Sequence, residues 1–198
     1  MKTKLLRAAA VILCAAMIFS LAACSPGKIE SKSDKRRVVC TLFVLYDFVR
    51  EIAGDRVDLT LLLPPGMESH SYDPTPADMK AVSNADLLIR VGENMETWSA
   101  KLFDKSTGAG EYLDIASEMG LRLAAHEHEH EHETDEHIWT SPKNAQLMLS
   151  AVYNAICKVD PSDKQTYTKN KDAYAKQLSD LDNAYRSAVD NAKNKTIV

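Results

Sequence analysis

Short apolar runs and helical periodicity alternate along the first part of the chain. Residues 38–43, 57–63 and 86–91 are apolar and rich in β-branched side chains, which is typical of strands buried in a parallel sheet. Between the first two runs, residues 45–53 have the spacing of an amphipathic helix and are followed by Gly54, a common residue just after helix ends. This order of strand, helix and strand predicts an α/β fold with a parallel sheet flanked by helices.

Sequence signals for helix starts occur at two later positions. Thr75 and Ser141 are good N-cap residues, and each is followed by proline, which is favoured in the first turn of a helix. Apolar spacing extends both helices and indicates two further elements. The predicted elements are helices at 75–84, 95–103 and 141–158 and a short strand at 112–116.

A second periodicity covers residues 162–193 without interruption. Its apolar positions are separated by three, four or seven residues, which predicts one long amphipathic helix of about 45 Å that crosses from one lobe to another. A coiled-coil seam is the alternative, although tyrosines are unusual at seam positions. Residues 195–198 then begin an apolar run that is typical of a strand. The apolar positions of the helix are Tyr167, Tyr174, Leu178, Leu181, Tyr185 and Ala188.

The first 23 residues have the layout of an export signal. Basic residues precede an almost wholly apolar stretch at 8–21, which is shorter than the roughly twenty residues that a membrane span needs. Leu21, two alanines and Cys24 resemble a bacterial lipobox, which implies cleavage before Cys24 and a lipid on its thiol. An uncleaved anchor or ordinary signal-peptidase cleavage is the alternative. Residues 24–37 are predicted to form a polar tether.

Removal of residues 1–23 makes the chain more acidic. It takes away three basic residues and no acidic one, so the formal net charge changes from −4 to −7. An acidic chain without a basic patch interleaved with aromatic residues argues against nucleic-acid binding and favours cations. Cys40 and Cys157 stay in the exported part. A disulfide between them and two buried free thiols are the two alternatives.

Alternating histidine and glutamate between residues 126 and 132 make metal the first functional hypothesis, and His137 follows shortly after. Nitrogen ligands with some carboxylate favour zinc over calcium or magnesium, and manganese, nickel and copper are the alternative metals. A solvated low-complexity loop is the alternative conformation, and it is compatible with loose collection of metal ions. The histidines of this accessory metal loop are His126, His128, His130 and His132.

The same repeat matches the H-E-x-x-H pattern of zinc metalloproteases at two overlapping positions. That pattern requires a helix that places both histidines and the glutamate beside one metal ion. Here a two-residue repeat generates the match, and Thr134 and Asp135 interrupt it. The chain is therefore predicted not to be an enzyme, with a secreted zinc hydrolase as a rival hypothesis.

Three motifs resemble those of the zinc- and manganese-binding solute-binding proteins of bacterial ABC transporters. They are G-M-E-S-H-S-Y-D-P-T-P at 66–76, N-A-D-L-L-I at 84–89 and H-I-W-T-S-P at 137–142. The resemblance covers residues 38–198. It implies two α/β lobes joined by a long helix, with the metal ion held between the lobes.

The resemblance implies two metal ligands from the first lobe, namely His70 and His137. Glu136 stands where this family usually has aspartate before the second histidine, and Glu68 is a candidate acceptor that fixes the tautomer of an imidazole. The implied function is high-affinity capture of Zn²⁺ outside the cell membrane and its delivery to a permease and its ATPase, with Cys24 as the lipid anchor. A manganese-type member and a metal-binding surface adhesin are the alternatives.

Family members continue beyond the last residue of this sequence and supply a third and a fourth ligand there. The chain is therefore expected to be an N-terminal part, with the second lobe missing. Two imidazoles leave a tetrahedral zinc site half filled, so weaker binding than in a complete protein is expected. The expected divisions are a lipoprotein signal peptide at 1–23, the tether at 24–37, a metal-binding lobe at 38–160 with the His-rich loop at 126–137, the interlobe helix at 161–194 and the start of the second lobe at 195–198.

Overall fold

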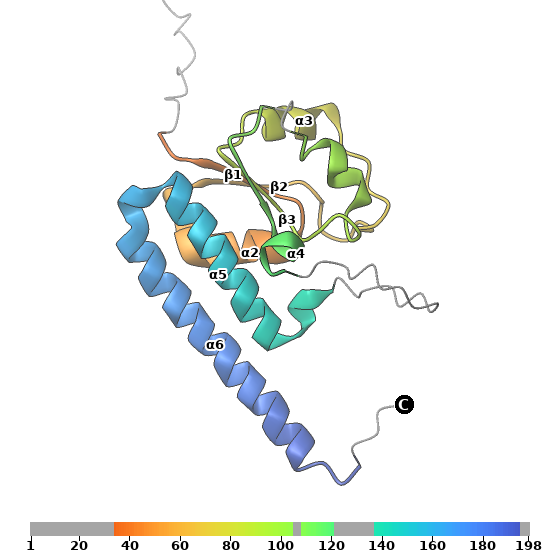
Figure 1. Cartoon of the computed structure of the whole chain (residues 1–198), viewed down its shortest axis with the longest axis vertical. Helices are drawn as coiled ribbons and strands as arrows, with labels where there is room; N and C mark the ends of the chain where they lie inside the picture. The colour runs from red at the N-terminus through yellow and green to blue at the C-terminus, as the bar shows by residue number, and fades with distance from the viewer. Residues whose placement is uncertain (1–33, 105–107, 121–136, 195–198) are drawn as a thin grey trace, which may run out of the picture. The chain divides into compact units, whose positions relative to one another are not determined.

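A parallel sheet forms the centre of the computed structural model, which describes residues 34–104, 108–120 and 137–194 (Figure 1). Its four strands lie in the order β2-β1-β3-β4. Val39 of β1 pairs with Leu88 of β3 on one side and with Thr60 of β2 on the other. The predicted α/β class with a parallel sheet is confirmed. The strands are β1 (Arg37–Cys40), β2 (Asp58–Leu61), β3 (Leu87–Arg90) and β4 (Glu111–Asp114).

Both faces of the central strands are covered, because successive side chains of a strand point to opposite faces. Val38 and Cys40 of β1 belong to a large core with α2, α5 and α6, whereas Val39 belongs to a smaller core with Val82 of α3 and Leu102. Burial on both faces explains why these strands read as continuous apolar runs in the sequence. The helices are α2 (Phe43–Ala53), α3 (Pro76–Ser83), α4 (Ile115–Glu118), α5 (Pro142–Val159) and α6 (Lys164–Asp190).

The two predicted N-caps are present. Thr75 and Asp78 form a reciprocal capping box at the start of α3, and Pro76 occupies its first turn. The hydroxyl of Ser141 accepts a hydrogen bond from the amide of Asn144 at 3.4 Å and caps α5. These caps satisfy backbone donors that have no partner inside the helix.

Two segments differ from their predicted form. Residues 95–103 contain a 3₁₀ helix, η2 (Thr97–Lys101), instead of an α-helix. The predicted strand at 112–116 begins one residue earlier and ends at Asp114, whose side chain accepts from Ser117 N and caps α4. In both places an acidic side chain accepts from a backbone amide, Glu96 from Val91 and Asp114 from Ser117, but only Asp114 caps the helix that follows it.

The long helix is confirmed as α6, which has 27 residues and is about 40 Å long. A 3₁₀ turn, η5 (Pro161–Asp163), precedes it. Fully buried Tyr167 donates to Asp160 at 2.6 Å, and Asn170 donates to the carbonyl oxygen of Ile52 at 2.9 Å. The first half of α6 is therefore fixed to α5 and α2, as Figure 1 shows.

Several sequence predictions lie outside the described residues. These are the signal peptide, the lipidation site Cys24, the accessory metal loop 126–132 and the apolar run 195–198. The described helices include none that is long and apolar enough to cross a membrane. Cys40 and Cys157 are free thiols, the first buried and the second partly buried, so the disulfide alternative is wrong.

Candidate metal centre

The two motif histidines lie side by side near the carboxyl ends of the strands. His70 belongs to the loop between β2 and α3, and His137 begins the turn before α5. Their ring centroids are 5.8 Å apart, with an angle of 66° between the ring planes. Both side chains are exposed. Loops that follow the carboxyl ends of parallel strands are the usual place for ligand binding in α/β folds, and the histidine pair occupies this place.

The spacing of the two rings fits a shared metal ion. Two imidazoles that bind one tetrahedral zinc ion at about 2.1 Å place their ring centroids about 5 Å apart. The observed 5.8 Å is therefore within about 1 Å of that arrangement. Across residues 34–104, 108–120 and 137–194, no group of three or more His, Cys, Asp or Glu side chains could hold a metal ion. The described part of the chain thus offers two nitrogen ligands.

Glu68 shapes the backbone beside His70. Its Oε1 accepts a hydrogen bond from the backbone N–H of His70 at 3.0 Å. This bond is the main reason why the pKa of Glu68 is below its ordinary value. The described bond ends on the amide of His70 and gives Glu68 a role in the shape of the loop, while its role in fixing a ring tautomer stays a prediction.

Trp98 connects the His70 loop to η2. Its indole Nε1 donates to the carbonyl oxygen of Ser69 at 2.7 Å, next to His70 in the chain. The indole also meets the ring of Tyr72 edge to face, with centroids 5.0 Å apart. Tyr72 in turn donates to Asp78 at 2.8 Å, and burial, followed by this bond, raises the pKa of Tyr72 to about 12. Aromatic and polar contacts therefore hold the backbone on both sides of His70.

His137 is fixed by the short 3₁₀ helix η4 (Ile138–Thr140). Thr140 donates to the carbonyl oxygen of His137 twice, from its amide at 3.1 Å and from its hydroxyl at 2.7 Å. Ile138 and Trp139 are partly buried and pack against the main core. The ordered position predicted for His137 from these two apolar neighbours is confirmed.

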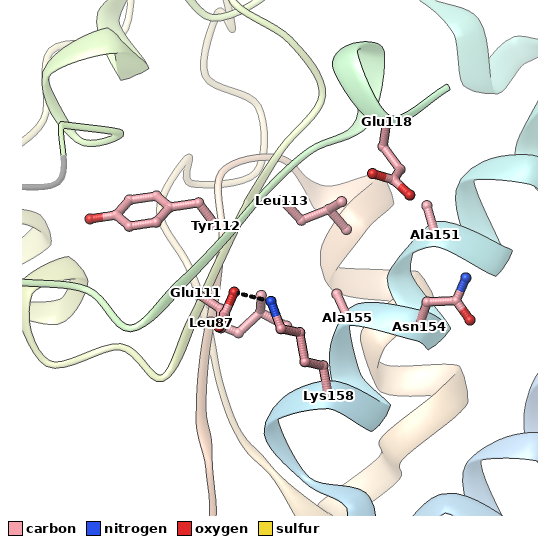
Figure 2. A pocket seen from close by; sticks show the side chains of 9 residues that line it. All are labelled: Leu87, Glu111, Tyr112, Leu113, Glu118, Ala151, Asn154, Ala155 and Lys158. Carbon is pink, nitrogen blue, oxygen red and sulfur yellow. Dashed lines mark hydrogen bonds and ion pairs between the residues drawn. The ribbon is translucent and has the colours of Figure 1, made fainter. Parts of the chain in front are cut away.

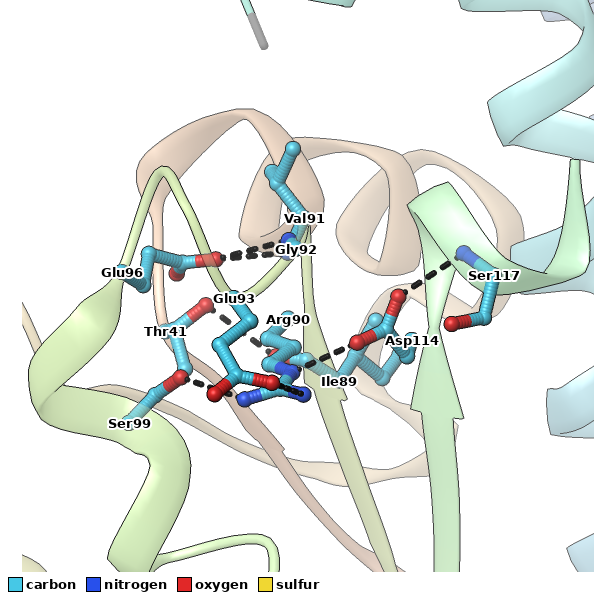
Figure 3. Close-up of polar contacts among 10 residues, drawn as sticks. All are labelled: Thr41, Ile89, Arg90, Val91, Gly92, Glu93, Glu96, Ser99, Asp114 and Ser117. Atoms are coloured by element: carbon cyan, nitrogen blue, oxygen red, sulfur yellow. Dashed lines mark hydrogen bonds and ion pairs between the residues drawn. The ribbon is translucent and has the colours of Figure 1, made fainter. Parts of the chain in front are cut away.

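A buried arginine joins the elements below this edge of the sheet, as Figure 3 shows. Arg90 at the end of β3 is 8% exposed, and its Nε donates to Asp114 at 2.7 Å. Its Nη1 donates to the Ser99 hydroxyl at 3.1 Å, and its guanidinium lies 4.4 Å from the ring centroid of Phe103. Arg90 therefore connects β3, β4 and η2 through its side-chain contacts.

A buried carboxyl group, that of Glu96, lies near Arg90 (Figure 3). Oε2 of Glu96 accepts from the amides of Val91 at 2.7 Å and Gly92 at 3.2 Å, while Oε1 is buried without a described hydrogen-bond partner. Burial raises the pKa of Glu96 to about 7, although the Thr41 side chain, the two amides and the charge of Arg90 oppose this shift. Neither Glu96 nor Trp98 was recognised from the sequence, because their partners lie in other elements.

A separate pocket lies between β4 and α5 (Figure 2). It has a volume of about 190 Å³ and is lined by apolar side chains such as Leu87, Leu113 and Ala155 and by polar ones such as Glu118. Lys158 and Glu111, which form an ion pair at 2.7 Å, also line it. Since neither His70 nor His137 lines this pocket, it is distinct from the candidate metal centre.

Comparisons with known proteins give one consistent family. The model of the family described as zinc-uptake complex component A, periplasmic, matches residues 38–198. The high-affinity zinc uptake system protein ZnuA of Bacillus subtilis (strain 168) is 37% identical over 199 residues, which cover 93% of this chain and 62% of that protein. The manganese ABC transporter substrate-binding lipoprotein PsaA of Streptococcus pneumoniae is 34% identical over 199 residues, which cover 96% of this chain and 64% of that protein.

A solved structure supports the same conclusion. The metal-dependent lipoprotein YcdH from Bacillus subtilis matches with a TM-score of 0.70 at 34% identity, over 80% of this chain and 57% of that one. The chain thus spans less than two thirds of the length of these relatives.

A parallel α/β lobe that pairs two histidines at its sheet edge and continues into a long helix defines a lobe of the substrate-binding class. The chain belongs to the family of the periplasmic zinc-uptake complex component A. This membership confirms the resemblance seen in the sequence. The family is one of solute-binding proteins and not of enzymes, which argues against the zinc hydrolase hypothesis.

Proposed function

We propose that this chain captures Zn²⁺ outside the cell membrane as the substrate-binding component of an ABC importer, and that His70 and His137 are ligands from its first lobe. The observation that carries the proposal is the 5.8 Å separation of two imidazoles from distant parts of the sequence. Neutral imidazole is a common zinc ligand, and both rings are exposed to incoming metal. The role extends to the partners of such a component, a membrane permease and its ATPase, with Cys24 as the lipid anchor.

Manganese is the second candidate substrate, because the relative PsaA is named for manganese. Manganese prefers carboxylate, carbonyl and water oxygens, whereas imidazole suits zinc, copper, iron and nickel. The two described candidate ligands are both imidazoles, and the accessory histidines at 126, 128, 130 and 132 add the same chemistry. These donor types favour zinc. No described feature favours the adhesin alternative.

Zinc titration by calorimetry on residues 25–198 tests the proposal. We expect a His70→Ala/His137→Ala variant to lose the tightest site, and a deletion of residues 126–132 to lose only weaker sites. A Met67→Leu variant is a matched control, because it changes an exposed side chain of the same loop and removes neither an imidazole nor the bond from His70 to Glu68. The proposal is overturned if the deletion alone abolishes all zinc binding. A parallel titration with Mn²⁺ that gives the tighter site would assign manganese instead.

A further inference from the structure

We propose that Trp98 is a positioning residue for the metal centre, which holds the His70 loop so that the His70 imidazole stays opposite His137. The inference rests on the proposed function, because it names the residue that prepares one of the two ligands. Trp98 contacts neither ring in the described hydrogen bonds and ring pairs, so it acts through the backbone of the loop.

The His70 loop has few internal means of holding its shape. Residues 64–68 are exposed, and Gly66 has a positive φ of 85°, a conformation that favours glycine. The described contacts inside the loop are short in range, such as Met67 N to Pro64 O at 3.2 Å and the amide of His70 to Glu68. An anchor outside the loop is therefore needed to fix His70 relative to the sheet.

The indole supplies this anchor at a position adjacent to His70. The bond from Trp98 Nε1 to Ser69 O joins residues 29 positions apart, at a short distance of 2.7 Å. The Tyr72 ring packs edge to face on the same indole. Ser69 and Tyr72 lie on either side of His70, so one side chain restrains the backbone before and after the ligand.

Trp98 can act as an anchor because its own element is rigidly held. The ring packs against the core that contains Val39 and Leu88 of the central strands. The neighbouring Ser99 is fully buried; its amide donates to Glu96 O at 2.7 Å, and its hydroxyl accepts from Arg90 of β3 (Figure 3). The restraint on the His70 loop thus reaches β3 through covalent bonds and hydrogen bonds.

A pocket of about 340 Å³ borders Trp98 and is lined by Asp73, Met79 and Leu102, among others. The loop therefore has space to shift toward α3 if the bond to Ser69 is lost. Since a metal site must hold its ligands within about 0.5 Å of their productive positions, such a shift lowers affinity.

A Trp98→Phe variant tests the proposal, because phenylalanine keeps an aromatic ring beside Tyr72 but lacks the Nε1 donor. Tyr112→Phe is the matched control. It also removes an aromatic donor to a backbone carbonyl, that of Asp104 at 3.2 Å, in the same smaller core but away from His70. Zn²⁺ affinity is measured on the full chain by competition with a chromophoric chelator, and amide hydrogen exchange at residues 69–72 is measured without metal.

We expect Trp98→Phe to weaken the zinc site that depends on His70 and His137 about tenfold, as for other groups that orient metal ligands. It should also speed amide exchange at residues 69–72, while Tyr112→Phe changes neither. Unchanged affinity in Trp98→Phe, or equal losses in both variants, would overturn the proposal.

The two levels of inference are separable in this design. If His70→Ala/His137→Ala leaves the zinc affinity of the chain unchanged, the proposed function is wrong, and zinc affinity can no longer test the role of Trp98. Amide exchange then tests that role alone, because it needs no metal. Exchange at residues 69–72 that is the same in Trp98→Phe and in the unmodified chain overturns the role of Trp98 in either case.

Discussion

Glu96 is the least expected single residue in the structure. It is an acid with no exposed surface, and one of its oxygens has no described hydrogen-bond partner. Transfer of a carboxylate from water into such a place favours the neutral form, and the pKa of Glu96 is raised from 4.5 to about 7. Between these two values the folded chain keeps the proton that the unfolded chain has released.

This difference predicts a stability that falls as pH rises. Unfolding releases the Glu96 proton between about pH 4.5 and 7, so higher pH favours the unfolded state over that window and has no further effect through this group above it. The total contribution is on the order of 3 kcal/mol. Glu96→Gln should remove this slope, as measured by urea unfolding at several pH values. Glu93→Gln, an exposed change in the same turn, should keep it; parallel curves for Glu96→Gln and the unmodified chain would contradict the assignment.

The two thiols should react at very different rates. Cys40 is fully buried, and burial, followed by the charge of Glu96, raises its pKa, so little of the reactive thiolate is present. Cys157 on α5 is only partly buried. On residues 25–198 we expect one thiol to react rapidly with a disulfide reagent and the other on the order of a hundredfold more slowly, after local opening. Cys157→Ser should remove the fast phase; a fast phase that persists would show that Cys40 is accessible.

At the scale of residues, the sequence could identify the candidate ligands but not the residues that hold them in place. His70 and His137 stand in motifs of contiguous letters, which can be read without a structure. The bond from Trp98 to Ser69 and the burial of Glu96 depend on segments that meet only after folding. No local periodicity encodes such contacts, so the supports of the site were not predictable.

At the scale of elements, α6 has two different halves. Its first half is fixed by Tyr167, Asn170 and Tyr174, which reach α2 or the turn before the helix. Further along, the large apolar side chains of Leu181, Tyr185 and Val189 are 45%, 59% and 55% exposed. They are separated by four residues and so form one apolar stripe on the helix surface.

The apolar stripe of Leu181, Tyr185 and Val189 should make the 198-residue chain self-associate or bind hydrophobic dyes. Replacement of all three by glutamine keeps good helix formers but removes the apolar surface. We expect dye binding to fall and association, measured by sedimentation velocity, to weaken about a hundredfold. Asn183→Gln on the same helix should have no effect. Unchanged association in the triple variant would show that another surface is responsible.

Most elements were predictable, and the exceptions have local causes. The strands were recognised because burial on both faces produces unbroken apolar runs, and α3 and α5 because Thr75 and Ser141 cap them. Residues 95–103 were predicted as a helix because Met95, Trp98 and Leu102 are spaced by three and four residues, whereas the structure has the shorter 3₁₀ helix η2 there. The Glu96 side chain binds the amides of Val91 and Gly92, a contact that helical periodicity does not reveal.

At the scale of the whole molecule, long-range packing brings the two histidines together. A strand, helix and strand unit predicts parallel neighbours, but it does not predict that β1 lies between β2 and β3. Although β2 and β4 are the two outer strands of the sheet, the loop after β2 and the segment before α5 come together, with the two ring centroids 5.8 Å apart. The class of the fold was therefore within reach of the sequence, whereas the geometry of the site was not.

The same long-range pairing predicts how zinc affects folding. The histidines at 126–132 are neighbours in sequence and stay together when the chain unfolds, so zinc bound there stabilises the folded and unfolded states to a similar extent. His70 and His137 are close only in the folded chain. Zinc at that pair therefore binds one state selectively, and at 100 times its dissociation constant it stabilises the fold by about 2.7 kcal/mol.

Thermal unfolding with and without zinc should separate the two kinds of site. We expect saturating zinc to raise the midpoint by several degrees in the unmodified chain and in the deletion of 126–132, at roughly 2–4 °C per kcal/mol for a chain of this size. The rise should disappear in His70→Ala/His137→Ala. It should also shrink on acidification, because a protonated imidazole cannot bind metal. If the double variant keeps the full rise while the deletion loses it, the folded chain holds its zinc at the repeat, and the pair at the sheet edge is not the capture site.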